Sequence, residues 1–230
     1  KCLLIADHKS VDKQIHIFNK NDFSYLTSIG NFGEGPEEIT VMGCLAIDEA
    51  HHQLYVSDHA KQKIFSYDMD SVMVDSLYKP QVKTAMNETL FPSEYQYIND
   101  TLSIAVLIKP TSTSTFNQFL GRWNMNTGEM IPMKYTHPDI QKKRITFAAS
   151  EKAGIYVECY TRHDLMTICS LDGELLYNIY GPDWDGGNGN KLQSFGTVMI
   201  GNDKIFVSYC GEDYARDSFP TKILVFDLEG

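Results

Sequence analysis

Two Asp-His pairs are the residues in this chain best suited to chemistry. Asp7-His8 and Asp58-His59 each come directly after a run of four mainly apolar residues. If the two runs are neighbouring strands, two imidazoles and two carboxylates would lie at one rim, where they suit a divalent metal or acid–base catalysis. The alternative is that both Asp side chains accept turn N–H groups and both His side chains are exposed. We favour this alternative, because the corresponding positions after three further runs carry no such pair.

Two of those further positions hold tyrosines. Tyr160 and Tyr209 each end or follow a comparable apolar run. We therefore predict that they lie at the same rim as the Asp-His pairs and are candidate binding residues. Val106-Leu107 occupies the remaining equivalent position and offers no polar group.

A glycine-rich segment at residues 181–190 carries oxygen ligands of the kind that calcium takes. They are Asp183, Asp185, Asn188 and Asn190. The spacing departs from the EF-hand pattern, so a long connecting loop is favoured over a calcium site. Trp184 in this loop, with Tyr214 and Phe219 further on, is predicted to form an exposed contact patch. The alternative is that each ring packs against its own loop.

Nucleophilic catalysis has little support in the sequence. No Gly-x-Ser-x-Gly motif occurs, so no serine is marked as a nucleophile. His163-Asp164 is interpreted as a hairpin tip. The five cysteines have no Cys-x-x-Cys spacing, and an odd number cannot pair completely, so we expect buried free thiols and no zinc site. We assign no catalytic residue and no cofactor, and we leave open a calcium ion at Asp183, Asp185 and Asn188.

Charge excludes one class of partner. The chain of 230 residues has a net charge of −10 and a pI near 5.1, which disfavours a nucleic-acid partner. Lys142, Lys143 and Arg144 form the one basic cluster, interpreted as a solvated loop. No apolar run approaches the ~18 residues of a transmembrane helix.

The elements that would position these residues repeat along the chain. Runs equivalent to residues 54–57 start at residues 3, 54, 102, 155 and 205, and a period of about 50 residues is typical of propeller blades. Between residues 43 and 78, four apolar runs at 44–47, 53–57, 63–67 and 71–77 predict a four-stranded meander, and residues 79–92 are predicted to be a linker. Both faces of the runs are apolar, as expected for sheets covered on both sides.

These residues carry a resemblance to a known fold family. The Gly-x-Phe-Gly-x-Gly-Pro-x-Glu turn at residues 30–38, followed by LAID, LYVSD and KIFSYD, resembles an NHL-type blade. The chain as a whole is similar to uncharacterised bacterial six-bladed, TolB-like propellers. The resemblance implies an all-β propeller of four-stranded antiparallel blades in a single domain spanning residues 1–230. The expected blades are residues 1–30, 43–78, 94–134, 145–180 and 196–230.

The ends of the repeat suggest that part of the propeller lies outside this chain. The first blade lacks its inner strand and the last lacks its outer strand, so we expect about five blades of a six-bladed propeller. A five-bladed ring closed by unusual strand sharing is the weaker alternative.

The resemblance implies a binding function rather than a specific activity. We expect a non-catalytic module that recognises a protein, peptide or glycan through its rim loops. The alternative is a divalent-metal-dependent hydrolase or lactonase with a site in the central channel, as in gluconolactonase-type relatives. A third possibility is a structural subunit that pairs through exposed strand edges. Relatives of this type imply an extracytoplasmic location, periplasmic or at the cell surface, with a lipid anchor in the full-length protein.

Overall fold

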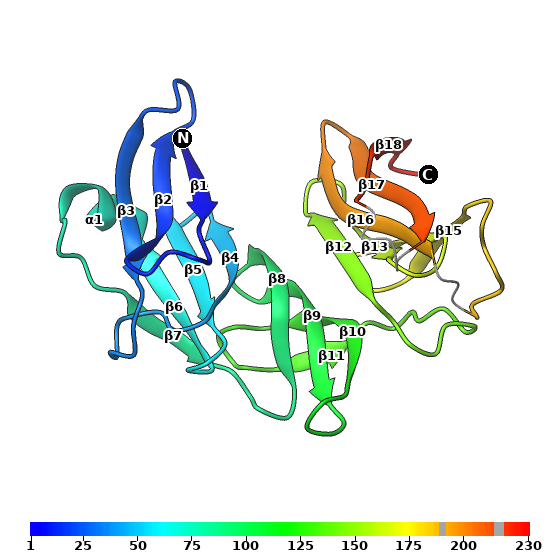
Figure 1. Ribbon diagram of the computed structural model, residues 1–230, viewed down its shortest axis with the longest axis horizontal. Helices are drawn as coiled ribbons and strands as arrows, with labels where there is room; N and C mark the ends of the chain where they lie inside the picture. The colour runs from blue at the N-terminus through cyan, green and yellow to red at the C-terminus, as the bar shows by residue number, and fades with distance from the viewer. Residues whose placement is uncertain (189–191, 214–218) are drawn as a thin grey trace. The chain divides into compact units, whose positions relative to one another are not determined.

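The computed structural model describes residues 1–188, 192–213 and 219–230 as five antiparallel sheets (Figure 1). In each sheet, every strand pairs with the next one along the chain, which is the meander predicted from the repeat. We call the sheets the first to fifth blades. No helix among the described residues is long and apolar enough to span a membrane. The predicted all-β propeller fold is confirmed.

The first, second and third blades are built from β1 to β11. They comprise β1 (Cys2–Ala6), β2 (Lys13–Asn19) and β3 (Tyr25–Asn31); then β4 (Met42–Asp48), β5 (Gln53–Asp58), β6 (Lys63–Asp68) and β7 (Gln81–Ala85); then β8 (Phe91–Asn99), β9 (Leu102–Pro110), β10 (Phe116–Trp123) and β11 (Met130–Pro132).

The fourth and fifth blades complete the described fold. They comprise β12 (Ile145–Ser150), β13 (Ile155–Tyr160), β14 (Leu165–Ser170) and β15 (Leu175–Tyr180); then β16 (Leu192–Gly201), β17 (Lys204–Asp213) and β18 (Lys222–Asp227). The strand register of β13 with β14 runs from Ile155 opposite Ser170 to Cys159 opposite Met166.

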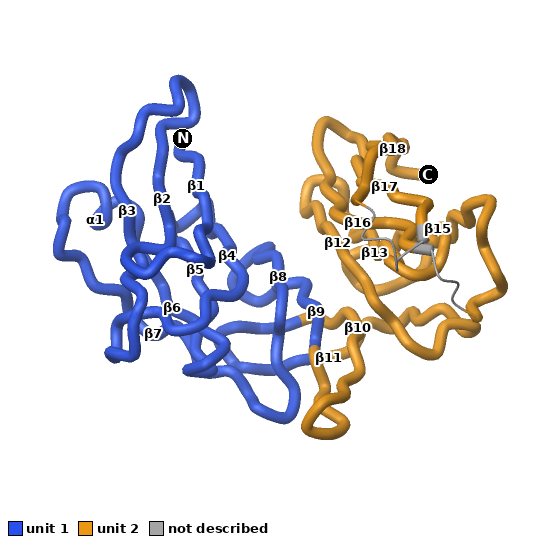
Figure 2. The backbone as a smooth tube through the Cα atoms, viewed as in Figure 1, with its two compact units in different colours: residues 1–107, 123–130 blue, residues 108–122, 131–230 orange. Residues whose placement is uncertain are grey.

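The chain divides into two compact units, and the boundary passes through the third blade (Figure 2). Unit 1 comprises residues 1–107 and 123–130, and unit 2 comprises residues 108–122 and 131–230. The first strands of successive blades are neighbours within each unit, β4 beside β8 and β12 beside β16. This is the strand order expected when the first strand of each blade is the inner one.

Apolar clusters between blades explain why both faces of the strands are apolar. In unit 1, Ile15 of β2 packs with Leu54 and Val56 of β5, and all three are fully buried. In unit 2, Val157 of β13 packs with Val207 of β17 in the same way. Burying each such side chain stabilises the fold by about 1.5–3 kcal/mol, so blade-to-blade contact is a main source of stability within each unit.

One predicted strand is wrong. Residues 71–77 were expected to form the fourth strand of the second blade, but the chain forms helix α1 (Met69–Val74), and β7 lies within the expected linker. The Asp68 side chain accepts the N–H of Ser71 and caps the helix, which favours a helical start. Val72 and Val74 are two residues apart in the sequence. This spacing is that of residues on one face of a strand, which is why the sequence predicted a strand here.

The glycine-rich turn at residues 30–38 is held by its own side chains. The Glu38 carboxylate accepts the N–H of Gly35 at 2.8 Å, and the Lys61 ammonium donates to the carbonyl oxygens of Gly33 and Glu38. A Cβ atom at Gly33 would lie 2.0 Å from the Glu38 carboxylate. The backbone of Gly33 has a φ of 157°, which residues with a Cβ atom rarely adopt, so glycine is favoured at this position. The turn links the first blade to β4.

Two kinds of connection lie at the same end of each sheet. Because the strands alternate in direction, the connection entering the first strand and the loop between the second and third strands lie at the same end. We call this end of a blade the entry rim. The predicted candidate residues lie in loops of this kind or at the strand ends beside them, with β1 and β2 of the first blade equivalent to β5 and β6 of the second.

Candidate functional site

Asp58 at the entry rim of the second blade is fully engaged in backbone contacts. Its side chain is 0% exposed, and its oxygens accept the N–H groups of Thr40 at 2.8 Å, Val41 at 3.2 Å and Ala60 at 3.0 Å. Asp7 in the first blade accepts the N–H of Lys9 at 3.0 Å. These contacts are those of turn residues.

The imidazoles of His8 and His59 lie along the start of β4. Nδ1 of His8 is 3.2 Å from the carbonyl oxygen of Met42, and Nε2 of His59 would be 2.4 Å from a Cβ atom at Gly43. Burial lowers the pKa of His59, although Asp58 and a hydrogen bond with the Ser93 backbone oppose this shift. In the described chain, the two Asp-His pairs do not gather into a group of three metal-ligating atoms.

A different set of metal-ligating side chains meets at the opposite end of unit 1. One donor atom from each of Asp48, His51 and Asp100 lies within 4.8 Å of the others. Nδ1 of His51 is 2.8 Å from Asp48 Oδ2 and 3.9 Å from Asp100 Oδ1, and the Tyr97 hydroxyl donates to Asp100 at 2.8 Å. The sequence could have predicted that these residues meet, because residues 48–52 and 99–101 form equivalent turns in neighbouring blades.

Hydrogen bonds set the charge of this group. Burial raises the pKa of the Asp48 carboxyl, but hydrogen bonds from His51 and Tyr97 outweigh burial and leave its pKa below the usual range. The hydrogen bond to Asp48, with the charges of Asp48 and Asp100, raises the pKa of His51. The group could hold a cation through one imidazole and two carboxylates. Because the pKa of His51 is raised, a proton would compete with a metal ion for this imidazole.

Trp184 packs against its own loop and two imidazoles of unit 2. Its ring centroid is 5.0 Å from that of Tyr180, 5.3 Å from that of His137 and 6.4 Å from that of His163. Phe219 is 79% exposed, and Tyr214 lies outside the described residues. Trp184 thus follows the alternative interpretation, in which the ring packs locally.

The oxygen-rich loop around Trp184 is closed by internal hydrogen bonds. The N–H of Asp183 donates to the Asp164 carboxylate at 2.9 Å, Asp185 Oδ1 accepts the N–H of Gly187, and the Asn188 side chain donates to the Asp185 carbonyl oxygen. Asn190 lies outside the described residues. No metal-ligating group is found here in the part of the loop that the structure describes.

The two candidate tyrosines each lie beside a buried charged side chain, Lys143 for Tyr160 and Asp164 for Tyr209. Tyr160 is fully buried, with the Lys143 ammonium 5.7 Å from its ring centre. The Tyr209 hydroxyl donates to Asp164 Oδ1 at 3.2 Å, and burial, followed by the Asp164 charge, raises the pKa of Tyr209 to about 12. Lys143 itself is buried and pairs with Glu158, so the interpretation of residues 142–144 as a solvated loop is wrong at its central residue.

A groove at the entry rim in unit 2 was not predicted from the sequence. It has a volume of about 400 Å³ and lies between the β9–β10 hairpin and the segment leading into β12. We call it the rim groove, and it is lined by Thr111, Ser114, Thr115, Phe116, Asn117, Gln118, Gln141, Lys142, Lys143 and Arg144. Small-ligand sites have volumes of roughly 300–1,000 Å³, so the groove can hold a ligand group.

Arg144 and Phe116 form a cation–π contact in the rim groove. The guanidinium carbon of Arg144 lies 4.5 Å from the Phe116 ring centre, and Nη1 donates to the Lys143 carbonyl oxygen at 2.8 Å. Stacking and this hydrogen bond hold the guanidinium plane in one orientation. The sequence missed the site because the hairpin and the basic segment belong to different blades.

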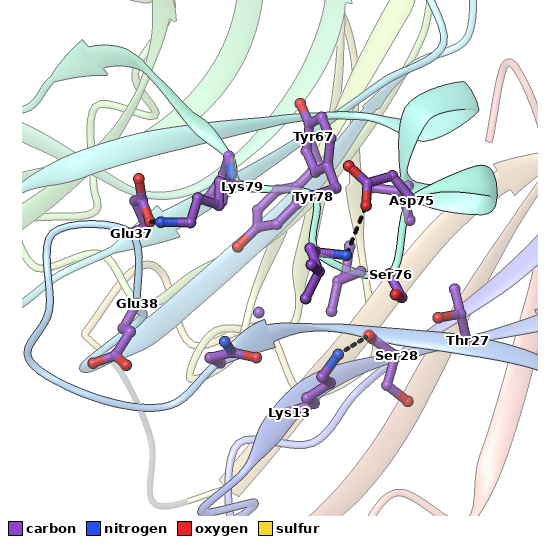
Figure 3. A pocket seen from close by; sticks show the side chains of 16 residues that line it. Lys13, Thr27, Ser28, Glu37, Glu38, Tyr67, Asp75, Ser76, Tyr78 and Lys79 are labelled. Carbon is purple, nitrogen blue, oxygen red and sulfur yellow. Dashed lines mark hydrogen bonds and ion pairs between the residues drawn. The ribbon is translucent and has the colours of Figure 1, made fainter.

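A second cavity of about 400 Å³ lies in unit 1 between β3 and residues 75–80 (Figure 3). Its charges are paired or tied to backbone. Lys79 Nζ is 2.7 Å from Glu37, Lys13 Nζ donates to the Ser28 carbonyl oxygen, and the Asp75 carboxylate accepts the N–H of Leu77. Because cations and carboxylates both line this cavity, it has no single charge preference.

Comparisons with known proteins agree with the fold. Residues 1–104 match the family model DUF5128, described as a 6-bladed beta-propeller. No curated protein matches the chain. A solved structure of a DUF4221 family member from Bacteroides vulgatus is similar, with a TM-score of 0.59 and 10% identity, and the match covers 99% of this chain and 75% of that one.

A second solved structure, entitled U3-55K, gives a TM-score of 0.57 and 12% identity, with 99% of this chain and 59% of that chain covered. At these identities the likeness concerns the fold alone. The antiparallel blades, their order and these similarities together identify the chain as a β-propeller, with its first 104 residues similar to a 6-bladed family.

Proposed function

We propose that this chain is a non-catalytic binding module that recognises its ligand through loops at the entry rim, with the rim groove as the contact surface. The observation that carries the proposal is the lining of the rim groove, where neutral amides and hydroxyls surround a stacked guanidinium. Such side chains fix a ligand by hydrogen bonds. A protein, peptide or glycan could present the matching groups.

The state of the thiols supports a non-catalytic role. Burial raises the pKa of Cys44 and of Cys169 to about 11 each, and it also raises the pKa of Cys159. A thiol is nucleophilic as its thiolate, which needs a lowered pKa. None of these three cysteines is therefore suited to nucleophilic attack near neutral pH.

The surroundings of two rim imidazoles support the same conclusion. Burial lowers the pKa of His137 and of His163, and both rings pack against Trp184. A general base must reach the proton that it removes from a substrate. These rings instead fill the space beneath the rim.

The hydrolase alternative gains no specific support from the candidate carboxylates. A metal at the predicted pairs would need Asp58, whose oxygens already accept several N–H groups. Removing these contacts would break the link between β5 and the connection into β4. We therefore retain the binding function alone.

The finer family type and the cellular location are part of the proposal. The turn at residues 30–38, with Glu38 closing the loop, supports an NHL-like or TolB-like type. An extracytoplasmic location follows from the resemblance to such proteins. Fractionation of cells that produce the full-length protein, followed by detection of this chain in each fraction, tests the location.

Arrays of immobilised glycans and peptides test the binding proposal. The full chain is compared with Ser114→Trp, which places an indole in the rim groove. Thr113→Trp is the matched control, since Thr113 is an exposed residue of the same hairpin turn and does not line the groove. We expect the array signal to be lost in Ser114→Trp and kept in Thr113→Trp. Equal signals from both variants would refute the role of the groove.

A further inference from the structure

The rim groove differs in charge from the rest of the chain. Lys142 and Arg144 are exposed, and Lys143 lies behind them. No Asp or Glu is among the groove residues that the structure describes, although the chain carries a net charge of −10. By contrast, the cavity of unit 1 includes Glu37 and Asp75. The rim groove is therefore a local positive region suited to an anion.

Donor groups in the rim groove are free to bind that anion. Within the described residues, the guanidinium of Arg144 donates one hydrogen bond, from Nη1 to the Lys143 carbonyl oxygen, and the Lys142 ammonium has no ion-pair partner. The remaining guanidinium N–H groups can form a bidentate pair with a carboxylate or a similar oxyanion. Because Phe116 holds the plane, little conformational entropy is lost when the pair forms.

The neutral lining narrows the ligand class. Gln141 presents an exposed amide group to the groove. Thr111, Ser114 and Asn117 add hydroxyl and amide groups, and no aliphatic side chain lines the groove. Sugars present many hydroxyl donors to such acceptors, whereas peptide ligands commonly anchor apolar side chains in pockets. The lining therefore favours a sugar over a peptide.

We propose that the rim groove binds an acidic saccharide, with the sugar carboxylate held by Arg144 and Lys142 and its hydroxyl groups held by the exposed neutral side chains of Ser114, Asn117 and Gln141. This inference rests on the proposed function, since it names the ligand class of the same groove. It also explains why a positive region stands at the rim of an acidic chain: an anionic ligand would otherwise be repelled.

Calorimetric titration of the full chain tests the inference. The probes are an oligogalacturonate, a neutral malto-oligosaccharide of the same length and an oligoglutamate peptide. We expect the oligogalacturonate to bind more tightly than the other two. Arg144→Gln is expected to weaken it about tenfold or more, because charge-assisted hydrogen bonds are lost. Arg122→Gln is the matched control, since it removes the same charge from an exposed ion pair with Asp172 and should leave the affinity unchanged.

The outcomes separate this inference from the proposed function. Equal binding of the neutral and acidic saccharides, with loss in Ser114→Trp but not in Arg144→Gln, would overturn the acidic class and keep the groove as a binding site. Preference for oligoglutamate would overturn the saccharide class. Binding of oligogalacturonate that Ser114→Trp does not affect would overturn both, because the ligand would then lie elsewhere.

Discussion

The Nζ atom of Lys143 lies 3.1 Å from Oε1 of Glu158, and less than a tenth of either side chain is exposed. Lys143 belongs to the segment that enters the fourth blade, and Glu158 lies on β13. The pair therefore fixes the wall of the rim groove to the sheet below it. Its neighbour Arg144 remains exposed at the groove surface.

Lys143→Met is expected to destabilise the chain by about 3–5 kcal/mol, because it leaves the Glu158 carboxylate buried without its partner. The double variant Lys143→Met/Glu158→Leu is expected to recover most of this loss, since two apolar side chains replace the ion pair. Urea unfolding of the three proteins measures the effect. A double variant no more stable than Lys143→Met would show that the pair contributes through other contacts.

Asp58→Ala is expected to lower the free energy of unfolding by about 3 kcal/mol, because several N–H groups lose a charged acceptor in a buried place. Asp7→Ala is the matched control at the equivalent blade position, where the side chain accepts one N–H. It is expected to cost about 1 kcal/mol or less. Similar losses in the two variants, measured by urea unfolding, would show that the buried contacts of Asp58 stabilise the fold no more than the single contact of Asp7.

The repeat pattern predicted the blades because inter-blade packing makes both faces of each strand apolar, and equivalent residues such as Val56 and Val157 recur at the required spacing. It failed at α1, since Val72 and Val74 fit a strand equally well and the cap made by Asp68 decides the outcome. The Asp-His pairs could be placed at one rim from strand direction. Their engagement with the backbone of Thr40 and Met42 could not, because that depends on how the chain enters the next blade.

The rim groove was harder to predict, because the residues of the β9–β10 hairpin are neutral and the basic residues 142–144 resemble an exposed loop in the sequence. Arg144 meets Phe116 only after β10 and the segment before β12 are placed together. Lys143 resembles its two neighbours in sequence, yet it is buried because its ammonium donates to Glu158 on β13. Charge patterns along the chain do not show which of three adjacent cations is buried, since that depends on a partner supplied by the sheet.

His51 should make the chain more stable on the acid side of neutrality. The hydrogen bond to Asp48 raises its pKa above the unfolded value of about 6.5. Its stabilising contribution is therefore fully present below about pH 6.5 and is lost as pH rises through the higher folded pKa. The destabilisation caused by His51→Gln is expected to be larger at about pH 5.5 than at about pH 8.5 in urea unfolding. Asp48 stays ionised across this range, because its pKa is lowered, and a pH-independent effect of His51→Gln would contradict the coupling.

His163 should act with the opposite sign. Burial lowers its pKa, with the His137 charge adding to this shift and Asp185 and the Lys142 backbone opposing it. A base with a lowered folded pKa binds its proton more readily in the unfolded state, so stability falls as pH drops below the unfolded value of about 6.5. His163→Phe keeps an aromatic ring against Trp184 and Tyr160 but removes this titration. The variant is expected to lose less stability than the original chain between about pH 7.5 and pH 5.5. An unchanged loss would show that His163 is protonated as easily in the folded chain as in the unfolded one.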